Sequence, residues 1–421
     1  MIIELLSGGQ TVYDSTLHAK TLARQIRKTD FEPGLLQIQL AQKPSAIARA
    51  VEVANAGFQS VALRRANIAG REVFQQSSLP EALITRHISE NIRRVTNVRQ
   101  GDRQSIVNCV RSLVSEGTAF NVLKLDIKSF YESVDPGATV KKLRNDAAFS
   151  RQSVEVLDSF FRSLQQQGVR GFPRGLELSA TLAEYVMRDF DRAVSHLSGV
   201  RFYSRYVDDI FILTSPAVQP ADIIYDAGGN LPEGLSFRRT KTRVCQFNRQ
   251  ISANPTVQYD FTFLGYCIKV TNILRSSDGL RRQVDIDIAP AKVRKIKRRI
   301  ALAILDYNNG GSFADLHDRI KILTSNYEFY DNRTGARRLA GIRYNYALID
   351  PRESGSLAAL DLFLYNALYS NNPKNRLRPT LSYPQRRCLW GYSFTSGFRS
   401  NRFFTFSQND LHRITRCWSH A

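Results

Sequence analysis

The chain has 421 residues and a formal net charge of +21, from 59 lysines and arginines against 38 acidic residues. This length allows more than one domain with a sizeable core, and the positive excess favours a polyanionic partner such as nucleic acid. The five scattered cysteines predict neither a zinc site nor a disulfide framework. No apolar run approaches the roughly 20 residues of a membrane span, and the first residues lack a signal-peptide pattern. We therefore expect a cytoplasmic protein without a membrane partner.

Helix formers dominate the first 100 residues, and we expect this region to be mostly helical, with helices near 19–26 and 46–63. Arg103 then precedes an apolar helix that ends at Val114.

An alternating segment follows at 120–127. Leu123, Leu125 and Ile127 occupy one face of the predicted strand, which leaves Asp126 on the opposite face near the strand end.

The segment 171–179 contains two glycines and a proline, which interrupt regular structure and let the backbone approach a ligand closely. The helix predicted after it, over 179–194, presents an apolar face formed by Leu182, Val186 and Phe190.

The segment 205–213 predicts a β-hairpin whose tip carries Asp208 and Asp209 between an aromatic-rich run and a run of β-formers. A solvated turn is the commoner explanation of such a pair alone. Together with Asp126 from a neighbouring strand, however, the acids would offer the hard oxygen ligands that suit Mg²⁺.

Three further segments carry basic or aromatic residues. Lys241 lies within the basic run 238–243, and a helix predicted at 291–305 has one apolar face and one basic face. A second helix begins at Leu316, a third is predicted over 357–369, and 331–350 has the composition of a loop. The segment from Trp390 to Trp418 is dense in aromatic residues and arginines.

In this order the motifs resemble those of reverse transcriptases. The resemblance rests on Leu125 to Tyr131, Gly171 to Ser179, Tyr206 to Asp209, Thr240 to Thr242, and Phe263 to Tyr266. It implies an α+β right-hand polymerase fold with fingers, a palm of antiparallel sheet plus helices, and a helical thumb. The expected ranges are 1–85 for a helical N-terminal extension and the start of the fingers, 86–270 for fingers and palm, 271–330 for the thumb, and 331–421 for a C-terminal extension.

The resemblance also implies roles for individual residues. Two Mg²⁺ ions, with Mn²⁺ as the alternative, would be held by Asp126, Ile127, Asp208 and Asp209, and Lys241 would protonate the leaving pyrophosphate. The nucleotide would meet Arg103, Tyr131 as a steric gate, Gly175 and Ser179. A primer grip would comprise Phe263, Leu264, Gly265 and Tyr266, and the nucleic-acid backbone would contact Lys292, Lys295 and Arg299.

Plainer explanations stay open for several of these residues. Arg103 could pair with Asp102 or Glu116 on the surface, and Tyr131 could be an ordinary core aromatic. Lys241 could be one more phosphate-facing charge. The aromatic C-terminal segment could stack on unpaired bases, or it could pack against the thumb or a protein partner.

Within the family, the run 323–327 and the C-terminal aromatic pattern resemble bacterial defence-associated enzymes, in particular the smaller polymerase of the type 3 two-enzyme system. This resemblance implies a non-coding RNA template, a DNA product made from dNTPs, a role in antiphage defence, and assembly with a second reverse transcriptase chain or a homo-oligomer. The alternatives are a retron or group II intron-like reverse transcriptase, and a catalytically silent RNA-binding module on the same fold.

Overall fold

The computed structural model describes residues 14–418, except 32–35, 37, 69, 147, 277–278, 332–335, 373–376 and 401–402. The chain forms two compact units. Unit 1 is drawn from Met1–Arg65, Val73–Arg99 and Tyr131–Val186, and unit 2 from Ala66–Glu72, Gln100–Phe130 and Met187–Ala421. Helices and mainly antiparallel sheets make up the described chain, which agrees with the predicted α+β class.

Unit 1 is helical. Its helices are α1 (Ala19–Ala23), α2 (Lys43–Ala56), α3 (Leu79–Thr96), α6 (Pro136–Asn145), α7 (Arg151–Gln166) and the first half of α8 (Glu177–Ser195), with short 3-10 turns at Lys28–Phe31 and Leu40–Gln42. Helix α7 shows why these segments fold: Ser150 caps the backbone N–H of Ser153, and Leu157, Phe160 and Leu164 form a buried face at helical spacing.

One part of the N-terminal prediction was wrong. The helix expected over 46–63 ends at Ala56, and it is followed by a two-stranded sheet of β1 (Leu63–Ile68) and β2 (Arg71–Gln76) within a region expected to be mostly helical. Helix α2 ends earlier because Gly57 adopts a φ of 81°, a left-handed conformation that stops the helix. Strand β1 is exposed along almost its whole length, so its sequence carries no period-two apolar signal.

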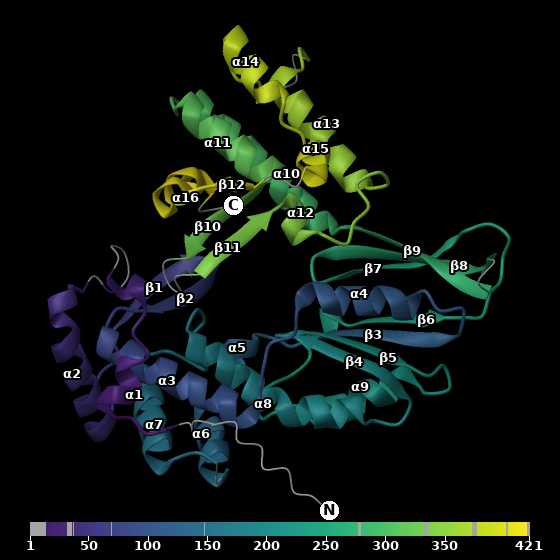
Figure 1. The fold of residues 1–421 in the computed structure, drawn as a ribbon. Coiled ribbons are helices and arrows are strands. Elements are labelled where there is room, and N and C mark those ends of the chain that lie inside the picture. Colours follow the sequence, from purple (N-terminus) through teal and green to yellow (C-terminus); the bar gives the residue numbers. More distant parts are fainter. Residues whose placement is uncertain are drawn as a thin grey trace, which may run out of the picture. The chain divides into compact units, whose positions relative to one another are not determined.

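Unit 2 contains a four-stranded antiparallel sheet in the order β4-β5-β3-β6. Its strands are β3 (Phe120–Asp126), β4 (Val200–Tyr206), β5 (Asp209–Thr214) and β6 (Arg243–Phe247). The second half of α8 and α9 (Pro220–Gly229) lie on one side of this sheet, and α4 (Arg103–Val114) lies on the other (Figure 1). Both faces of β3 are buried, and this fixes its register against β5.

A second antiparallel sheet, β7-β8-β9, shares the core on the α4 side. It comprises β7 (Val257–Phe263), β8 (Tyr266–Ser276) and β9 (Gly279–Ile288). Phe211 of β5 packs against Phe263 of β7 with ring centroids 5.3 Å apart. The helices α10 (Pro290–Asn308) and α11 (Phe313–Thr324) follow, and the predicted apolar stripe of α10 is buried at Ile300 and Ile304.

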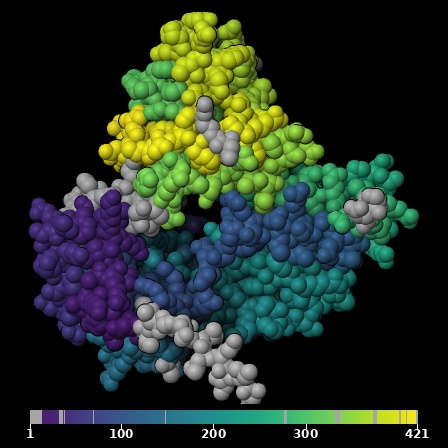
Figure 2. Space-filling model, viewed as in Figure 1, coloured from purple at the N-terminus to yellow at the C-terminus, as the bar shows by residue number. Residues whose placement is uncertain are grey.

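The C-terminal part is built onto these helices. Its elements are β10 (Asn326–Asp331), β11 (Ala336–Gly341), α12 (Ile342–Asn345), α13 (Gly355–Tyr369), α14 (Tyr383–Trp390), α15 (Phe394–Arg399), β12 (Phe403–Thr405), α16 (Gln408–Thr415) and a 3-10 turn at Arg416–Trp418. Figure 2 shows yellow C-terminal residues lying against the green residues of α11.

One expectation for the C-terminal part is confirmed by the structure, and another is wrong. Helix α13 agrees with the helix predicted over 357–369, whereas the segment 331–350, expected to be a loop, contains β11 and α12. The domain boundary predicted at residue 330 falls inside β10, and β10 pairs with both β11 and β12.

No described helix combines the length and apolar character that crossing a membrane requires. All five cysteines carry free thiols.

Candidate active site

The tight turn between β4 and β5 carries the first of the predicted acids. Tyr206 pairs with Asp209, so that Val207 and Asp208 form a two-residue turn. Val207 has a φ of 59°. A positive φ is a genuine outlier for a β-branched residue, and such strain persists only where the surroundings enforce it.

The end of β3 brings the third acid to this turn. Asp126 is the direct cross-strand partner of Asp209, and the backbone N–H of Ile127 donates to the carbonyl oxygen of Asp208 at 3.0 Å. Side chains of directly opposed residues share one face of a sheet. The structure therefore brings together all three acids and Ile127.

Cations surround Asp126, whose side chain is 5% exposed. Lys241 Nζ lies 2.5 Å from Oδ1, and Arg238 Nε lies 3.3 Å from Oδ2. The segment that carries both cations is attached to β3, because the N–H of Arg238 donates to the Asp126 carbonyl at 2.7 Å. Lys241 thus lies beside Asp126, and its role as proton donor stays a prediction.

The electrostatics of the site follow from burial and from this mixture of charges. Burial raises the pKa of Asp209; Lys124 opposes the shift, and the carboxylates of Asp208 and Asp126 add to it. Burial lowers the pKa of Lys124, against the attraction of Asp209 and Asp126. Two carboxylates that repel each other at the end of a sheet are stabilised by a shared cation.

The donor set fits a hard divalent cation. Asp126 Oδ2 is buried and accepts no hydrogen bond, so a divalent cation would bind this oxygen in place of its ion pair with Arg238. In the part of the chain that the structure describes, no three His, Cys, Asp or Glu side chains are already arranged as a metal cage. Mg²⁺ commonly takes one or two protein carboxylates together with substrate phosphates, which is compatible with this arrangement.

A half-buried hydrogen-bond network behind the turn was missed by sequence reasoning. Asp191, on the second half of α8, accepts hydrogen bonds from Arg205 Nε and Nη2, both at 2.8 Å, and from the Tyr203 hydroxyl at 2.5 Å. Arg205 Nη1 also donates to the carbonyl oxygen of Val207 at 3.1 Å. The network therefore fixes the strained turn from its β4 side. Arg205 in the aromatic-rich run before the turn was its signal, but the sequence did not identify the partner.

The predicted primer-grip residues form the hairpin turn between β7 and β8. Leu264 and Gly265 both have positive φ, 46° and 84°, as a tight two-residue hairpin requires. The carbonyl of Gly265 accepts from the N–H of Ala289 at 3.0 Å. The side chains of Phe263, Leu264 and Tyr266 are buried, so the turn exposes mainly its backbone to a ligand.

Arg103 lies at this turn. Its Nε donates to the carbonyl oxygen of Leu264 at 2.7 Å, its Nη1 donates to that of Asn345 at 3.0 Å, and its guanidinium lies 5.0 Å from the ring centre of Tyr266. These contacts make Arg103 a positioning residue of the β7–β8 turn. They lend no support to the predicted triphosphate contact or to a surface pair with Asp102 or Glu116.

Three other predicted nucleotide-binding residues belong to unit 1. Tyr131 is half-buried, with the guanidinium of Arg174 located 4.9 Å from its ring centre, and Arg174 forms a bidentate ion pair with Glu132. Gly175 has a φ of 95°, and a Cβ there would lie 2.6 Å from the carbonyl oxygen of Phe74. The close approach that requires this glycine is thus to strand β2. Ser179 is buried in the first turn of α8.

The three backbone-binding candidates on α10 separate into two groups. Lys292 and Lys295 are exposed. Arg299 instead packs against the C-terminal turn: its guanidinium lies 5.3 Å from the ring centre of Trp418, whose indole N–H donates to the Arg299 carbonyl at 2.9 Å. This packing draws the Arg299 guanidinium toward the C-terminal turn, and its contact with a nucleic-acid backbone stays a prediction.

The run 323–327 has a structural role. Asn326 is fully buried; its Oδ1 accepts from the N–H groups of Arg343 and Tyr344 at 3.0 and 3.2 Å, and its Nδ2 donates to the Gly397 carbonyl at 3.2 Å. The run therefore ties β10 to α12 and α15.

A comparison with known protein families finds a match to part of the chain. Residues 78–268 match the family model described as reverse transcriptase (RNA-dependent DNA polymerase). The search of curated proteins found no match. All five sequence motifs and the three acids lie inside the matched segment, which is somewhat less than half of the chain. The match supports a reverse transcriptase over these residues, that is, an RNA-directed DNA polymerase using an RNA template and dNTPs.

Proposed function

We propose that the chain copies an RNA template into DNA by nucleotidyl transfer with two divalent metal ions, on a right-hand polymerase fold. The observation that carries the proposal is the pairing of Asp126 with Asp209 across β3 and β5, with Asp208 in the adjoining turn and Lys241 beside them. On this fold the sheet β4-β5-β3-β6 would be the palm, unit 1 would supply the fingers, and α10 with α11 would be the thumb.

Asp126, Asp208 and Asp209, with the main chain at Ile127, would hold the ions. Bound there, magnesium or manganese would activate the primer 3′-hydroxyl and stabilise the charge on the leaving pyrophosphate. Lys241 would protonate that pyrophosphate, since a lysine next to carboxylates and phosphates can serve as a general acid. The half-buried network at Arg205 would hold Asp208 in position while the reaction proceeds.

Primer extension tests the proposal. The full chain is incubated with an RNA template, an annealed DNA primer, dNTPs and Mg²⁺, and is compared with the variant Asp208→Ala plus Asp209→Ala. We expect extension by the wild type, none by the variant, and equal RNA binding by both. RNA binding without extension by the wild type under all metal conditions would instead identify a catalytically silent RNA-binding module.

We further propose that the enzyme serves in bacterial antiphage defence and copies an associated non-coding RNA. The support is the resemblance of the run 323–327 and of the C-terminal aromatic pattern to defence-associated enzymes. Sequencing the RNA and DNA that copurify with the chain tests this proposal, and one dominant non-coding RNA with complementary DNA is the expected result. An intron RNA, or DNA covalently joined to its own template RNA, would favour the group II intron-like or retron alternative.

A further inference from the structure

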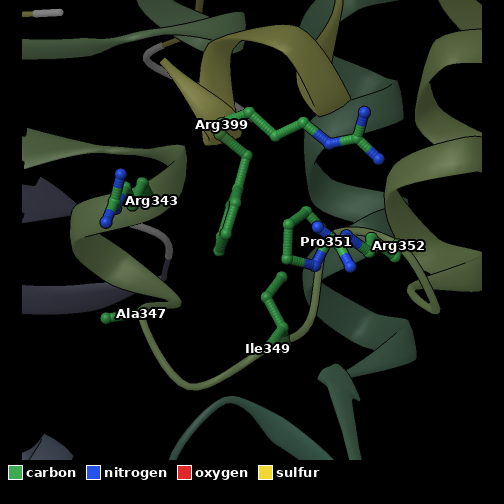
Figure 3. A pocket seen from close by; sticks show the side chains of 7 residues that line it. Arg343, Ala347, Ile349, Pro351, Arg352 and Arg399 are labelled. Atoms are coloured by element: carbon green, nitrogen blue, oxygen red, sulfur yellow. The ribbon is translucent and has the colours of Figure 1, made fainter. Parts of the chain in front are cut away.

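A cavity of about 440 Å³ lies in the C-terminal part of unit 2, away from the acids, among α12, the loop that follows it and α15. Three arginines, Arg343, Arg352 and Arg399, contribute to its lining, together with Ile349, Pro351 and Phe398. Figure 3 shows Arg343, Arg352 and Arg399 on three different segments around the cavity, with Pro351 beside Arg352 and Ile349 below it. This volume is within the range of small-ligand sites.

Acidic side chains lie beside this cavity rather than in its lining: Asp350 and Glu353 line a neighbouring cavity together with Arg352. All three arginines are exposed, and none of them forms an ion pair with a residue that the structure describes. The described residues of the lining include no aspartate or glutamate. Three unpaired guanidinium groups around one cavity create a positive field, and planar guanidinium donors match phosphate oxygens well.

The cavity floor is apolar. Ile349 and Phe398 are each 5% exposed, and both belong to the hydrophobic core of unit 2, so the floor is rigid. Apart from the arginines, the side chains of the lining carry no polar group that could read a base edge or a 2′-hydroxyl. Positive charge around an aromatic and aliphatic floor is the combination with which proteins bind single strands without sequence preference.

We propose that this cavity binds one unpaired nucleotide of a single-stranded nucleic acid, with the flanking phosphates on Arg343, Arg352 and Arg399 and the base on the apolar floor. The exposed, open arrangement of the arginines suits a strand that continues beyond the cavity on both sides. The proposal rests on the proposed function only in naming a template or product strand as the occupant, because binding itself requires no polymerisation.

The test measures binding of a fluorescent twelve-nucleotide single strand by anisotropy at several salt concentrations. The full chain carries Asp208→Ala plus Asp209→Ala in every sample, so that the outcome does not depend on polymerase activity. The test variant adds Arg343→Gln, Arg352→Gln and Arg399→Gln. Its matched control adds Arg49→Gln, Arg151→Gln and Arg162→Gln, three exposed arginines that each pair with an acid within one helical turn.

We expect the test variant to bind at least about tenfold more weakly than the control, with a salt slope smaller by about 2, since about 0.7 counterions are released per phosphate contact on a single strand. RNA and DNA strands should be affected alike, and replacing the three arginines by lysines should restore the slope. Equal affinity and slope in the test variant and its control would overturn the proposal. Competition by a free nucleotide as effective as that by the strand would also overturn it, because the cavity would then be a mononucleotide site.

Discussion

Arg205 and Asp191 form a two-point ion pair, and the same guanidinium donates to the carbonyl of Val207 in the turn that carries Asp208. The side chain of Arg205 is 4% exposed and that of Asp191 is 30% exposed, so the guanidinium is buried while its partner reaches the surface. Arg205 thus attaches the strained turn to helix α8, and the position of Asp208 depends on this attachment.

Replacing Arg205 by lysine should therefore impair both stability and catalysis. A lysine keeps the charge but cannot reach both carboxylate oxygens and the Val207 carbonyl at once. We expect a loss of about 2–3 kcal/mol in the free energy of unfolding and about a hundredfold fall in kcat, because small displacements of catalytic groups are costly. Arg201→Lys, at an exposed position of the same strand, is the control and should change neither. Full activity in Arg205→Lys would show that the network does not position the turn.

Tyr131 is expected to discriminate dNTPs from rNTPs. Its ring is held by Arg174, which is itself fixed by Glu132. Tyr131→Ala should raise the relative incorporation of rNTPs about 10- to 100-fold, since crowding of a larger group costs about 1–3 kcal/mol. Single-nucleotide incorporation assays measure the ratio, and Tyr131→Phe, which keeps the ring, should behave as wild type. A selectivity unaffected by loss of the ring would leave Tyr131 as a packing residue.

The packing of the C-terminal part on α11 can be tested with two glycines. A Cβ at Gly397 would lie 1.8 Å from the Thr324 carbonyl oxygen, whereas a Cβ at Gly391 would meet nothing within 4 Å. Gly397→Ala should destabilise the chain by about 3 kcal/mol or more through overpacking, and Gly391→Ala should be nearly neutral. Urea unfolding monitored by tryptophan fluorescence makes the comparison. Equal midpoints for the two variants would contradict the observed packing.

Glu81 should make unit 1 less stable as the pH rises. Burial raises the pKa of this carboxyl, against a hydrogen bond from the Ala62 N–H. The folded state therefore keeps the proton on Glu81 to a higher pH than the unfolded state does. The resulting contribution to stability is fully present below the ordinary glutamate pKa of the unfolded chain, and it is lost as the pH rises through the raised pKa of the folded chain. Glu81→Gln keeps an acceptor for Ala62 and should flatten the fall in unfolding free energy as the pH rises above the ordinary glutamate pKa. An unchanged pH profile would mean that Glu81 ionises freely in the folded chain.

Much of the candidate site could be predicted from the sequence because its signals are local. The alternation in β3 and the apolar run in β5 predicted two strands, and a short hairpin places the consecutive residues Asp208 and Asp209 at its tip. Helix α10 was likewise predicted from its apolar stripe.

The elements that were missed depend on pairing between distant segments. Strand β12 has only three residues and is defined by its parallel pairing with β10, far away in the sequence. The role of Arg103 at the Leu264 turn and the packing of Arg299 on Trp418 are likewise long-range contacts. No local pattern distinguishes such arginines from those that face a nucleic acid.

The most direct test of the central claim is single-turnover primer extension by Asp126→Asn, which keeps the size of the side chain and removes its charge. The control is Asp260→Asn, an exposed aspartate on β7 of the same unit. We expect a fall of at least about 1,000-fold in the rate of nucleotide addition for Asp126→Asn, with template binding retained and with no change in the control. Extension by Asp126→Asn within tenfold of the wild-type rate would show that the Asp126 carboxylate does not hold a catalytic metal ion.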